Sequence, residues 1–375
     1  MASRLQERTR DEIVRLSTRG LDVTGFFDEA GAILRKAVPF DGFCSMTVDP
    51  ATMLLTSHLA HDSVRPEDVP RLGRNEFLEE DVNKFGVLAR APRPAGVLTD
   101  ATGNDLEGSP RYRDILQPNG FRDELRFTLL DDGACWGWVA LYRREQSVDF
   151  EVADAEFVAS LSQLLAQGLR RAILLAAIPT ADEPDAPGLI LLAPGGKVET
   201  ITSAAERWLS LLIAAAPAEG DLPAVVNGVA YRALLTARGG SPEVGARARV
   251  PTSGGTWLIV HGSVVGDPAD GRTAVILEAA RSSEMAPLIV AAHGLTTRER
   301  EVTQLVLHGL STAEIAERLH LSEYTVQDHL KAIFEKVGVR SRRELVAQIF
   351  FRHYVPRLEM GVKIGATGWF SEAGP

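Results

Sequence analysis

The stretch that most constrains this 375-residue chain lies near its C-terminal end, between Ser311 and Gly338. It reads STAEIAERLHLSEYTVQDHLKAIFEKVG, which predicts a short helix that Ser311 caps, a tight turn, and a longer helix that Ser322 caps. In the second helix apolar residues return every three or four positions, which leaves the opposite face polar. One face is therefore suited to packing, and the other is expected to meet solvent or a partner.

A short helix, a tight turn and a second helix with a polar face suit the DNA major groove, which admits one α-helix. The side chains expected on that face include Gln327, Asp328 and Lys331. Glutamine can bond adenine through two hydrogen bonds, lysine can donate to guanine, and aspartate can accept from cytosine. Because Gln327 and Lys331 are one helical turn apart, they could address neighbouring base pairs.

The surrounding segment, residues 297–351, is helical in pattern throughout, with the short connections of a small bundle. A first helix over 298–308 is expected to end at Gly309. A fourth helix has an apolar face that is either core or a dimer contact. The apolar residues of these helices are Val302, Leu305, Val306, Ile315, Ala316, Leu319, Val326, Leu330, Ile333, Phe334, Val337, Leu345, Val346, Ile349 and Phe350.

The charge of the chain is distributed unevenly. The net charge is −10 and the isoelectric point is near 5.4, which argues against non-specific coating of nucleic acid. Residues 295–358 hold ten basic and eight acidic side chains, a net charge of +2, so the other residues carry −12. The basic residues are densest in KVGVRSRR (336–343), which can reach phosphates beside the groove. A surface that binds a polyanion is therefore expected in this segment.

Residues 295–349 resemble the LuxR-type DNA-binding domain. The resemblance rests on LTTRERE in the first helix, GLSTAEIAERLHLS across the turn, TVQDHLKAIFEKVGV in the recognition helix and RSRRELV after it. It implies a transcription regulator that binds double-stranded promoter DNA as a homodimer and works with RNA polymerase. It implies base contacts from Gln327, Asp328 and Lys331 and phosphate contacts from Thr325 and Lys336. The predicted DNA-binding set also includes Ser322, Arg340 and Arg342.

Three positions depart from the pattern of that family. Thr312 stands where Asn is usual, Gln327 where Lys is usual, and Ala332 where Asn is frequent. Replacing Lys by Gln removes a cation that commonly meets DNA, so affinity and base preference are expected to differ from the family average. Asp328, being acidic, could instead exclude wrong sequences.

The N-terminal half predicts an α+β module. Helical spacing predicts a helix over 21–38, and FCSMTV (43–48) reads as a strand; loops rich in Pro, Gly and Asp follow over 62–124. ELRFTLL (124–130) and CWGWVALYRR (135–144) predict an antiparallel hairpin that turns at residues 131–133. This order of elements, and DELRFTLLDDGACWGWVALYRR in particular, resembles a GAF domain.

A long helix is expected after the hairpin, capped by Asp154 and running to about Ile178 before Pro179. Its apolar residues follow a seven-residue spacing that Gly168 interrupts. That face either packs on its own sheet or pairs with a second helix across a dimer. The residues concerned are Val158, Leu161, Leu165, Ala172 and Leu175.

The segment PTADEPDAP (179–187) predicts a domain boundary, because it holds three prolines and three acids. Beyond it, GLILLA and KVETIT predict a hairpin, a helix is expected to begin near Ser203, and ARARVP, TWLIVHGSVV and RTAVILEAA read as strands. The order of strands, with GLILLAPGGKVETITSAAERWL, resembles a PAS domain.

The predicted fold class is a multidomain α+β protein. Residues 1–179 are expected to form a GAF-like antiparallel sheet with helices, and residues 180–287 a PAS-like α+β domain. Residues 288–358 are expected to form an all-α, four-helix LuxR-type helix-turn-helix domain, followed by a tail over 359–375.

No catalytic or metal-binding constellation is predicted. HLAHD (58–62) falls on a strand and turn where its side chains do not converge on a metal, and Asp131 and Asp132 suit a turn better than a catalytic pair. Neither enzyme activity nor a cofactor is expected. Cys44 and Cys135 are most simply core residues, with a redox role as the alternative.

The chain has no apolar run that could cross a bilayer and no signal peptide, which favours the cytoplasm and excludes a membrane partner. The GAF-like and PAS-like modules suggest control by an unidentified small-molecule effector. Two rivals stay open. One is an adaptor whose sigma-like helical domain contacts RNA polymerase, and the other is an enzyme within residues 21–180.

Overall fold

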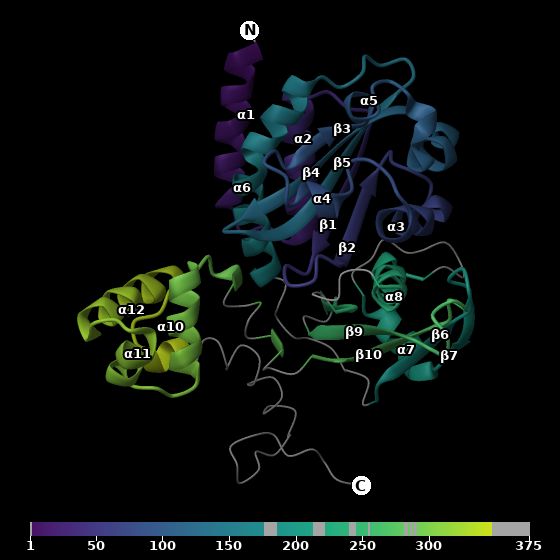
Figure 1. Ribbon diagram of the computed structural model, residues 1–375. Helices are drawn as coiled ribbons and strands as arrows, with labels where there is room; N and C mark the ends of the chain where they lie inside the picture. The colour runs from purple at the N-terminus through teal and green to yellow at the C-terminus, as the bar shows by residue number, and fades with distance from the viewer. Residues whose placement is uncertain are drawn as a thin grey trace. The chain divides into compact units, whose positions relative to one another are not determined.

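The computed structural model describes residues 2–175, 186–212, 222–239, 245–253, 256–280, 284–285, 288 and 291–346. Described residues up to Ala279 form one compact unit, and those from Ala280 onward form a second (Figure 1). The predicted tail (359–375), most of the predicted linker (179–187), and Ile178, Ile349 and Phe350 lie outside the described residues.

The first sheet of the N-terminal unit has five antiparallel strands in the order β2-β1-β5-β4-β3. The predicted hairpin is confirmed as β4 and β5, whose turn places Asp132 and Gly133 at φ 49° and 74°. Glycine tolerates that left-handed backbone without strain. The strands are β1 (Gly42–Val48), β2 (Leu55–His61), β3 (Ala95–Val97), β4 (Phe121–Asp131) and β5 (Ala134–Arg144).

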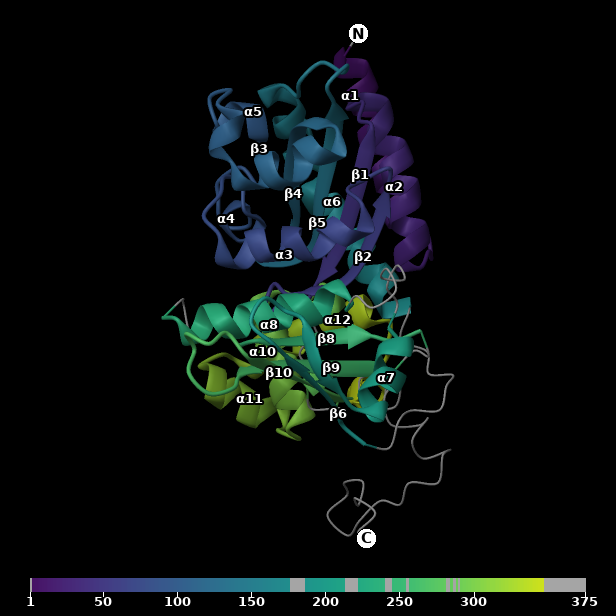
Figure 2. The same cartoon turned by 90° about the vertical axis from the view of Figure 1, so that its right-hand side faces the viewer.

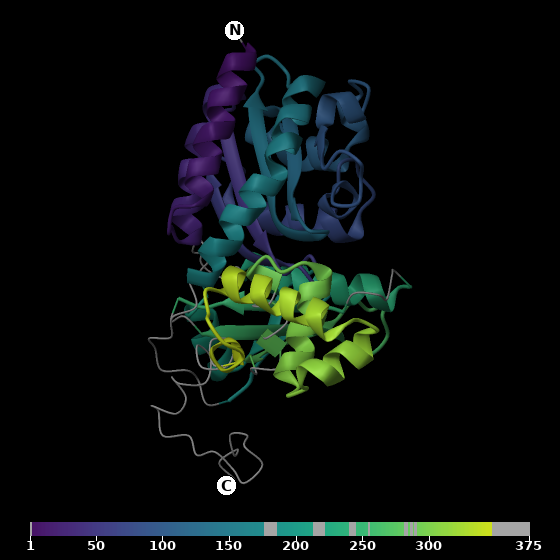
Figure 3. The same ribbon diagram turned by 90° about the vertical axis from the view of Figure 1, so that its left-hand side faces the viewer.

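Helices cover both faces of this sheet (Figure 3). One face packs against α6 (Val152–Leu175), which α1 (Ala2–Ser17) and α2 (Val23–Ala37) flank. The chain between β2 and β4 folds over the other face in short pieces, as its turn-rich composition predicts. These pieces are η1 (Pro66–Asp68), α3 (Val69–Leu78), α4 (Phe85–Leu88), α5 (Leu98–Ala101), η2 (Leu106–Gly108), the π-helical η3 (Tyr112–Leu116) and η4 (Gln117–Asn119).

The start of α6 corrects one prediction. The helix begins at Val152, so Asp154 lies in its first turn and is not the cap. Its carboxylate instead accepts a hydrogen bond from the backbone N–H of Glu151, with 3.1 Å between N and Oδ2. An acidic residue at the third helical position commonly makes such a bond. The face with seven-residue spacing is buried, with Val158 and Leu161 fully covered by the same unit. Packing within the module, the simpler of the two interpretations, therefore accounts for that face.

At Gly168, helix α6 lies close to α2 and to the end of α1. A Cβ atom at this position would lie 2.4 Å from Phe26 Cε2 and 3.0 Å from Ser17 Cα. We expect Gly168→Ala to lower the free energy of unfolding by about 1–3 kcal/mol through overpacking, although alanine favours a helix over glycine by about 1 kcal/mol.

Thermal denaturation of the full chain measures this effect, with Gly73→Ala in α3 as the matched control. The added Cβ at Gly73 would have no atom nearer than 3.5 Å, so the control should be neutral or stabilising. Equal melting temperatures for the two variants would contradict the close approach at Gly168.

The second sheet repeats the strand order of the first. Its order β7-β6-β10-β9-β8 becomes 2-1-5-4-3 when the strands are counted within the sheet, as in the first sheet. All of its ladders are antiparallel, and the predicted hairpin is confirmed as β6 and β7. The elements are β6 (Gly188–Leu192), β7 (Val198–Ile201), α7 (Ser203–Ser210), α8 (Ala224–Ala237), β8 (Arg247–Pro251), β9 (Trp257–Val264) and β10 (Thr273–Ala279).

The two sheets belong to one compact unit and share a hydrophobic cluster. Helix α8 packs on β9 of its own sheet and on α3 of the first module (Figure 2). A buried ion pair adds to this contact, because Arg249 on β8 donates from Nε to Asp49 Oδ2 at 2.8 Å, and Asp49 lies just after β1. The two modules therefore pack against each other through apolar and charged contacts.

The C-terminal unit is helical, and it completes the predicted fold class, which is confirmed: two antiparallel sheets with helices, followed by a helical domain. Helix α10 is followed by Gly309 at φ 84°, as predicted. The elements are α10 (Thr297–Leu307), α11 (Thr312–Leu319) and α12 (Glu323–Val337), and residues 342–346 are helical as well. The buried core is Leu295, Val302, Val306, Ile315, Ala316, Val326, Leu330, Ile333, Val337 and Leu345.

Candidate nucleic-acid interface

The turn between α11 and α12 is fixed by local hydrogen bonds. Ser311 and Glu314 form a capping box in which each side chain accepts the backbone N–H of the other. His320 closes α11 in the left-handed conformation at φ 54°, and its N–H bonds to the carbonyls of Ala316 and Glu317. Ser322 then caps α12 by accepting the N–H of Thr325 at 3.0 Å. Both predicted caps are confirmed, so the direction of α12 is set by its first residues.

One charged contact joins helix α10 to α12. The Nζ of Lys336 donates to Glu299 Oε2 at 2.6 Å, and the Glu299 side chain is 7% exposed. Burial alone would raise the pKa of Glu299. The hydrogen bonds from Lys336 and from the N–H of Thr296 outweigh burial and hold that pKa below its ordinary value. Glu299 is therefore ionised at neutral pH and joins α10 to the last turn of α12.

The polar face of α12 lies where the sequence predicts it. Gln327, Asp328 and Lys331 are exposed, while Val326 and Leu330 on the opposite face are buried. Within residues 291–346 no hydrogen bond or ion pair engages those three polar side chains. Their donors and acceptors are thus available to a ligand that approaches this face.

The other residues of the predicted DNA-binding set have mixed environments. Ser322 is exposed and Thr325 is half-buried, and their hydroxyls bond each other at 2.8 Å. Arg340 is exposed, and its backbone N–H donates to Glu344. Arg342 is half-buried and close enough to Glu314 to help lower the pKa of that carboxyl, after the stronger effect of the two hydrogen bonds from Ser311.

Two residues of this domain were not among the predicted site residues. Tyr324 stands in the first turn of α12 with 74% of its surface exposed, which is unusual for a large aromatic side chain. Arg298 donates from Nη2 to the carbonyl of Leu319 at 2.8 Å, so it satisfies the end of α11. Helical periodicity predicts that Tyr324 faces outward, as it does, whereas a tertiary contact such as that of Arg298 leaves no local pattern.

The other candidate residues have structural partners. His58 Nε2 lies 3.2 Å from Cys44 Sγ, whereas His61 Nε2 lies 2.8 Å from Asp28, so HLAHD does not converge. No group of three potential metal ligands gathers in the described ranges. Burial raises the pKa of both thiols, Cys44 and Cys135, to about 12, which leaves them protonated and poorly nucleophilic. Of the helices the structure describes, none has the length and apolar content to span a bilayer.

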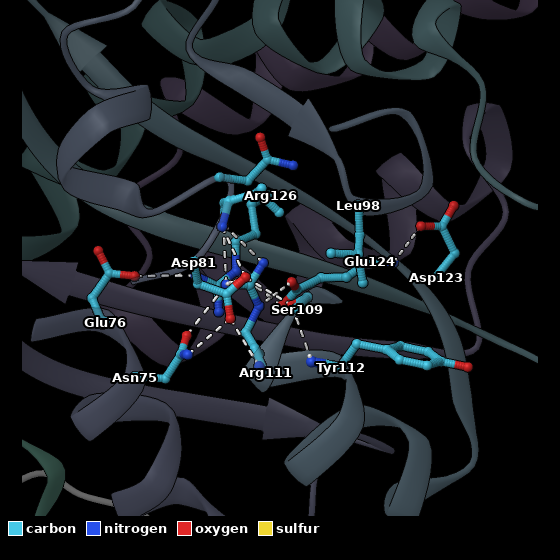
Figure 4. Close-up of polar contacts among 12 residues, drawn as sticks. Asn75, Glu76, Asp81, Leu98, Ser109, Arg111, Tyr112, Asp123, Glu124 and Arg126 are labelled. Atoms are coloured by element: carbon cyan, nitrogen blue, oxygen red, sulfur yellow. Dashed lines mark hydrogen bonds and ion pairs between the residues drawn. The ribbon is translucent and has the colours of Figure 1, made fainter. Parts of the chain in front are cut away.

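A buried charged cluster lies against the first sheet, between residues of the segment predicted as loops (62–124) and residues of β4 (Figure 4). The guanidinium of Arg111 contacts Glu124 at 2.8 Å and Asp81 at 3.7 Å. Arg126 pairs with Glu124 at 2.9 Å and with Glu76 at 3.1 Å. Asn75 and Ser109 donate to Asp81. Because each charge meets an opposite charge, the cluster has the arrangement of a structural network, and the sequence shows no catalytic motif there.

Residues 293–349 match the family described as bacterial regulatory proteins, luxR family. Spore germination protein GerE of Bacillus subtilis is 42% identical over 55 residues, which cover 15% of this chain and 74% of GerE. A protein of Mycobacterium tuberculosis named as an HTH-type transcriptional regulator is 50% identical over 52 residues, 14% of this chain and 6% of that protein. The chain therefore matches only a small part of the length of the mycobacterial relative.

Escherichia coli SdiA aligns over 91% of this chain and 95% of its own, with 11% sequence identity and a TM-score of 0.33. A score this low carries no argument about the fold or the ligand of the N-terminal unit.

Proposed function

The chain belongs to the LuxR family of bacterial regulatory proteins, and on that premise we propose that it regulates transcription by binding a specific promoter sequence. The exposed polar face of α12 is the observation that carries the proposal. Gln327, Asp328 and Lys331 are solvent-exposed on a helix whose start is fixed by Ser322 and whose end is joined to α10 by Lys336. A rigid helix with unengaged hydrogen-bonding groups suits direct reading of base edges.

In this proposal α12 enters the major groove with its N-terminal half toward the bases. Gln327 can bond adenine through N6 and N7, and Lys331, one turn later, can donate to guanine O6 or N7. Asp328 can accept a hydrogen bond from the N4 amino group of cytosine. Its negative charge disfavours base pairs that present only hydrogen-bond acceptors to it. These three side chains would set the sequence preference.

The phosphate backbone would be held by Ser322, Thr325, Arg340, Arg342 and Lys336, and Lys336 would also hold α12 against α10. The pairing of Lys336 with Glu299 satisfies its charge within the domain. Since 37% of the Lys336 side chain is still exposed, it can add positive potential near the groove while it holds α12 in place.

Two further parts of the proposal concern assembly and control. The protein would bind as a homodimer in the cytoplasm and act on RNA polymerase, under control of a small-molecule effector bound by the GAF-like or PAS-like module. The face of α6 with seven-residue spacing packs within its own unit, so the proposal places no dimer contact there. The fourth helix is the remaining candidate contact; its Leu345 is buried, so the contact would need other residues.

An adaptor that contacts RNA polymerase through a sigma-like helical domain is the second candidate. Such an adaptor would use the exposed face of α12 to bind a protein surface. Selectivity for a DNA sequence therefore distinguishes the regulator from the adaptor. Selection of full-length protein on randomised duplexes decides between them. We expect enrichment of one motif, with two-fold symmetry if the protein binds as a dimer, and no enrichment would reject the regulator.

Control by the N-terminal modules is tested with the enriched duplex. The affinity of the full-length protein is compared with that of segment 288–358, which contains the separate helical core. A tighter complex with the segment supports control by the sensor modules. Equal affinities would remove autoinhibition from the proposal while leaving DNA recognition in place.

A further inference from the structure

A cavity of about 470 Å³ lies in the N-terminal unit, where α8 of the second module meets the first. Its walls come from α3, the segment around α4, β5 and α8, and the apolar part includes Phe77 and Trp138. This volume falls within the range of about 300–1,000 Å³ that small-molecule sites occupy. Aromatic and aliphatic side chains form most of the lining, with a few charged groups among them.

The charged groups of this cavity are mostly basic. Lys84, Arg90 and Arg232 line it, and Glu76 is the acidic residue that faces them. The carboxylate of Glu76 is already engaged, since Arg126 lies 3.1 Å from it and the N–H of Gly86 donates to it at 3.3 Å. In the part of the chain that the structure describes, no carboxylate lies within ion-pair distance of the three cations. The cavity therefore carries uncompensated positive charge.

Arg232 on α8 is the most exceptional of the three. Its guanidinium lies over the ring of Phe77, 5.2 Å from the centroid, and its half-buried side chain leaves Nε without a hydrogen-bond partner among the described residues. Burial lowers the pKa of Arg232, and the like charge of Arg90 lowers it further. A partly buried guanidinium beside a like charge is electrostatically unfavourable, so an anion in the cavity would be attracted to Arg232 and would offset the repulsion from Arg90.

We propose that this cavity binds a small organic anion, with an aromatic or aliphatic body against Phe77 and Trp138 and an acidic group held by Arg232, Arg90 and Lys84. Because Arg232 comes from α8 and the other groups from the first module, the occupant contacts both modules at once. The proposal identifies the chemical class of effector within the proposed function, and it rests on that function for its regulatory meaning. Binding itself does not depend on DNA.

A pair of dyes that differ in charge tests the proposal on the full-length protein without DNA. Anilinonaphthalene sulfonate carries the acidic group, and N-phenylnaphthylamine has the same aromatic body without it. In fluorescence titrations the sulfonate dye is expected to saturate one site about tenfold or more tightly than the neutral dye, the gain typical of a charge-assisted hydrogen bond.

Variants locate the site. Arg232→Gln is expected to weaken the sulfonate dye about tenfold and to leave the neutral dye unchanged. Arg232→Lys, which keeps the charge, should retain most of the affinity, and Arg238→Gln at the exposed end of the same helix should bind like the wild type. Equal binding of the two dyes, absence of saturable sulfonate binding, or unchanged affinity in Arg232→Gln would each overturn the proposal. None of these results would affect the measured DNA selectivity.

Discussion

Replacing Arg111 by Met is expected to lower the free energy of unfolding of the N-terminal unit by about 3–5 kcal/mol, the cost of removing one partner from a buried ion pair. The Arg111 side chain is fully buried, at 0% exposure. It donates to Glu124 Oε2 at 2.8 Å and to the carbonyl of Val82 at 3.1 Å, and it lies 3.7 Å from Asp81. Methionine fills much of the space but leaves these buried acceptors and charges without their cation.

Urea unfolding followed by tryptophan fluorescence measures the loss. Arg113→Met is the matched control, because Arg113 is two residues away, exposed, and paired with Asp114 on the surface. The control should unfold close to the wild type. If both variants unfolded at the same urea concentration, the cluster in Figure 4 would contribute no more than a surface pair, contrary to its burial.

Some elements of the fold could be predicted from the sequence because their signals lie in residues that are close together in the chain. The hairpin of β4 and β5 shows alternate apolar residues and a turn rich in Asp and Gly, so both strands and their pairing can be read locally. The same holds for α11 and α12, whose caps at Ser311 and Ser322 lie within three residues of the N–H groups they bind.

Helix α8 and the buried charged cluster were not predicted, for physical reasons that differ. Helix α8 is buried on nearly every side, including Asn227 and Gly228, so it has no polar face and its sequence shows no helical period. The charged cluster was missed because Arg111 and its partners Asp81 and Glu124 are 30 and 13 positions apart, in a segment whose Pro, Gly and Asp content indicates loops. Only tertiary folding brings those charges together.

In the candidate site, too, some properties could be predicted from nearby residues and others could not. The outward face of α12 follows from periodicity, so the exposure of Gln327, Asp328 and Lys331 could be predicted. The environment of Lys336 could not, because its partner Glu299 is 37 positions away. Residues 295–358 predict a basic surface, and the structure adds that Lys336, one of those cations, joins α12 to α10 through Glu299.

Lys331→Ala is expected to weaken binding to the cognate duplex by about 1–3 kcal/mol, the value of a good base contact. The Lys331 side chain is exposed and takes part in no hydrogen bond or ion pair within residues 291–346, so the stability of the helical domain should not change. Lys336→Met, by contrast, is expected to change the stability of the helical domain. It breaks the contact with Glu299 and should lower domain stability by about 1–2 kcal/mol, since Lys336 is only partly covered.

The pH dependence of the Glu299 contact follows from the direction of its shift. Because the pKa of Glu299 is lowered in the folded domain, the contact stabilises the fold above the unfolded pKa, and this contribution is lost as pH falls through the folded pKa. The difference in stability between wild type and Lys336→Met should therefore shrink in acid.

The most direct measurement is the affinity of the full-length Gln327→Ala and Lys331→Ala variants for the selected duplex and for a scrambled duplex of equal length and salt. If α12 lies in the major groove, both variants lose about tenfold or more on the selected sequence and much less on the scrambled one. Losses that are equal on the two duplexes, or absent, would show that these side chains do not read bases and would contradict sequence-specific recognition by this helix.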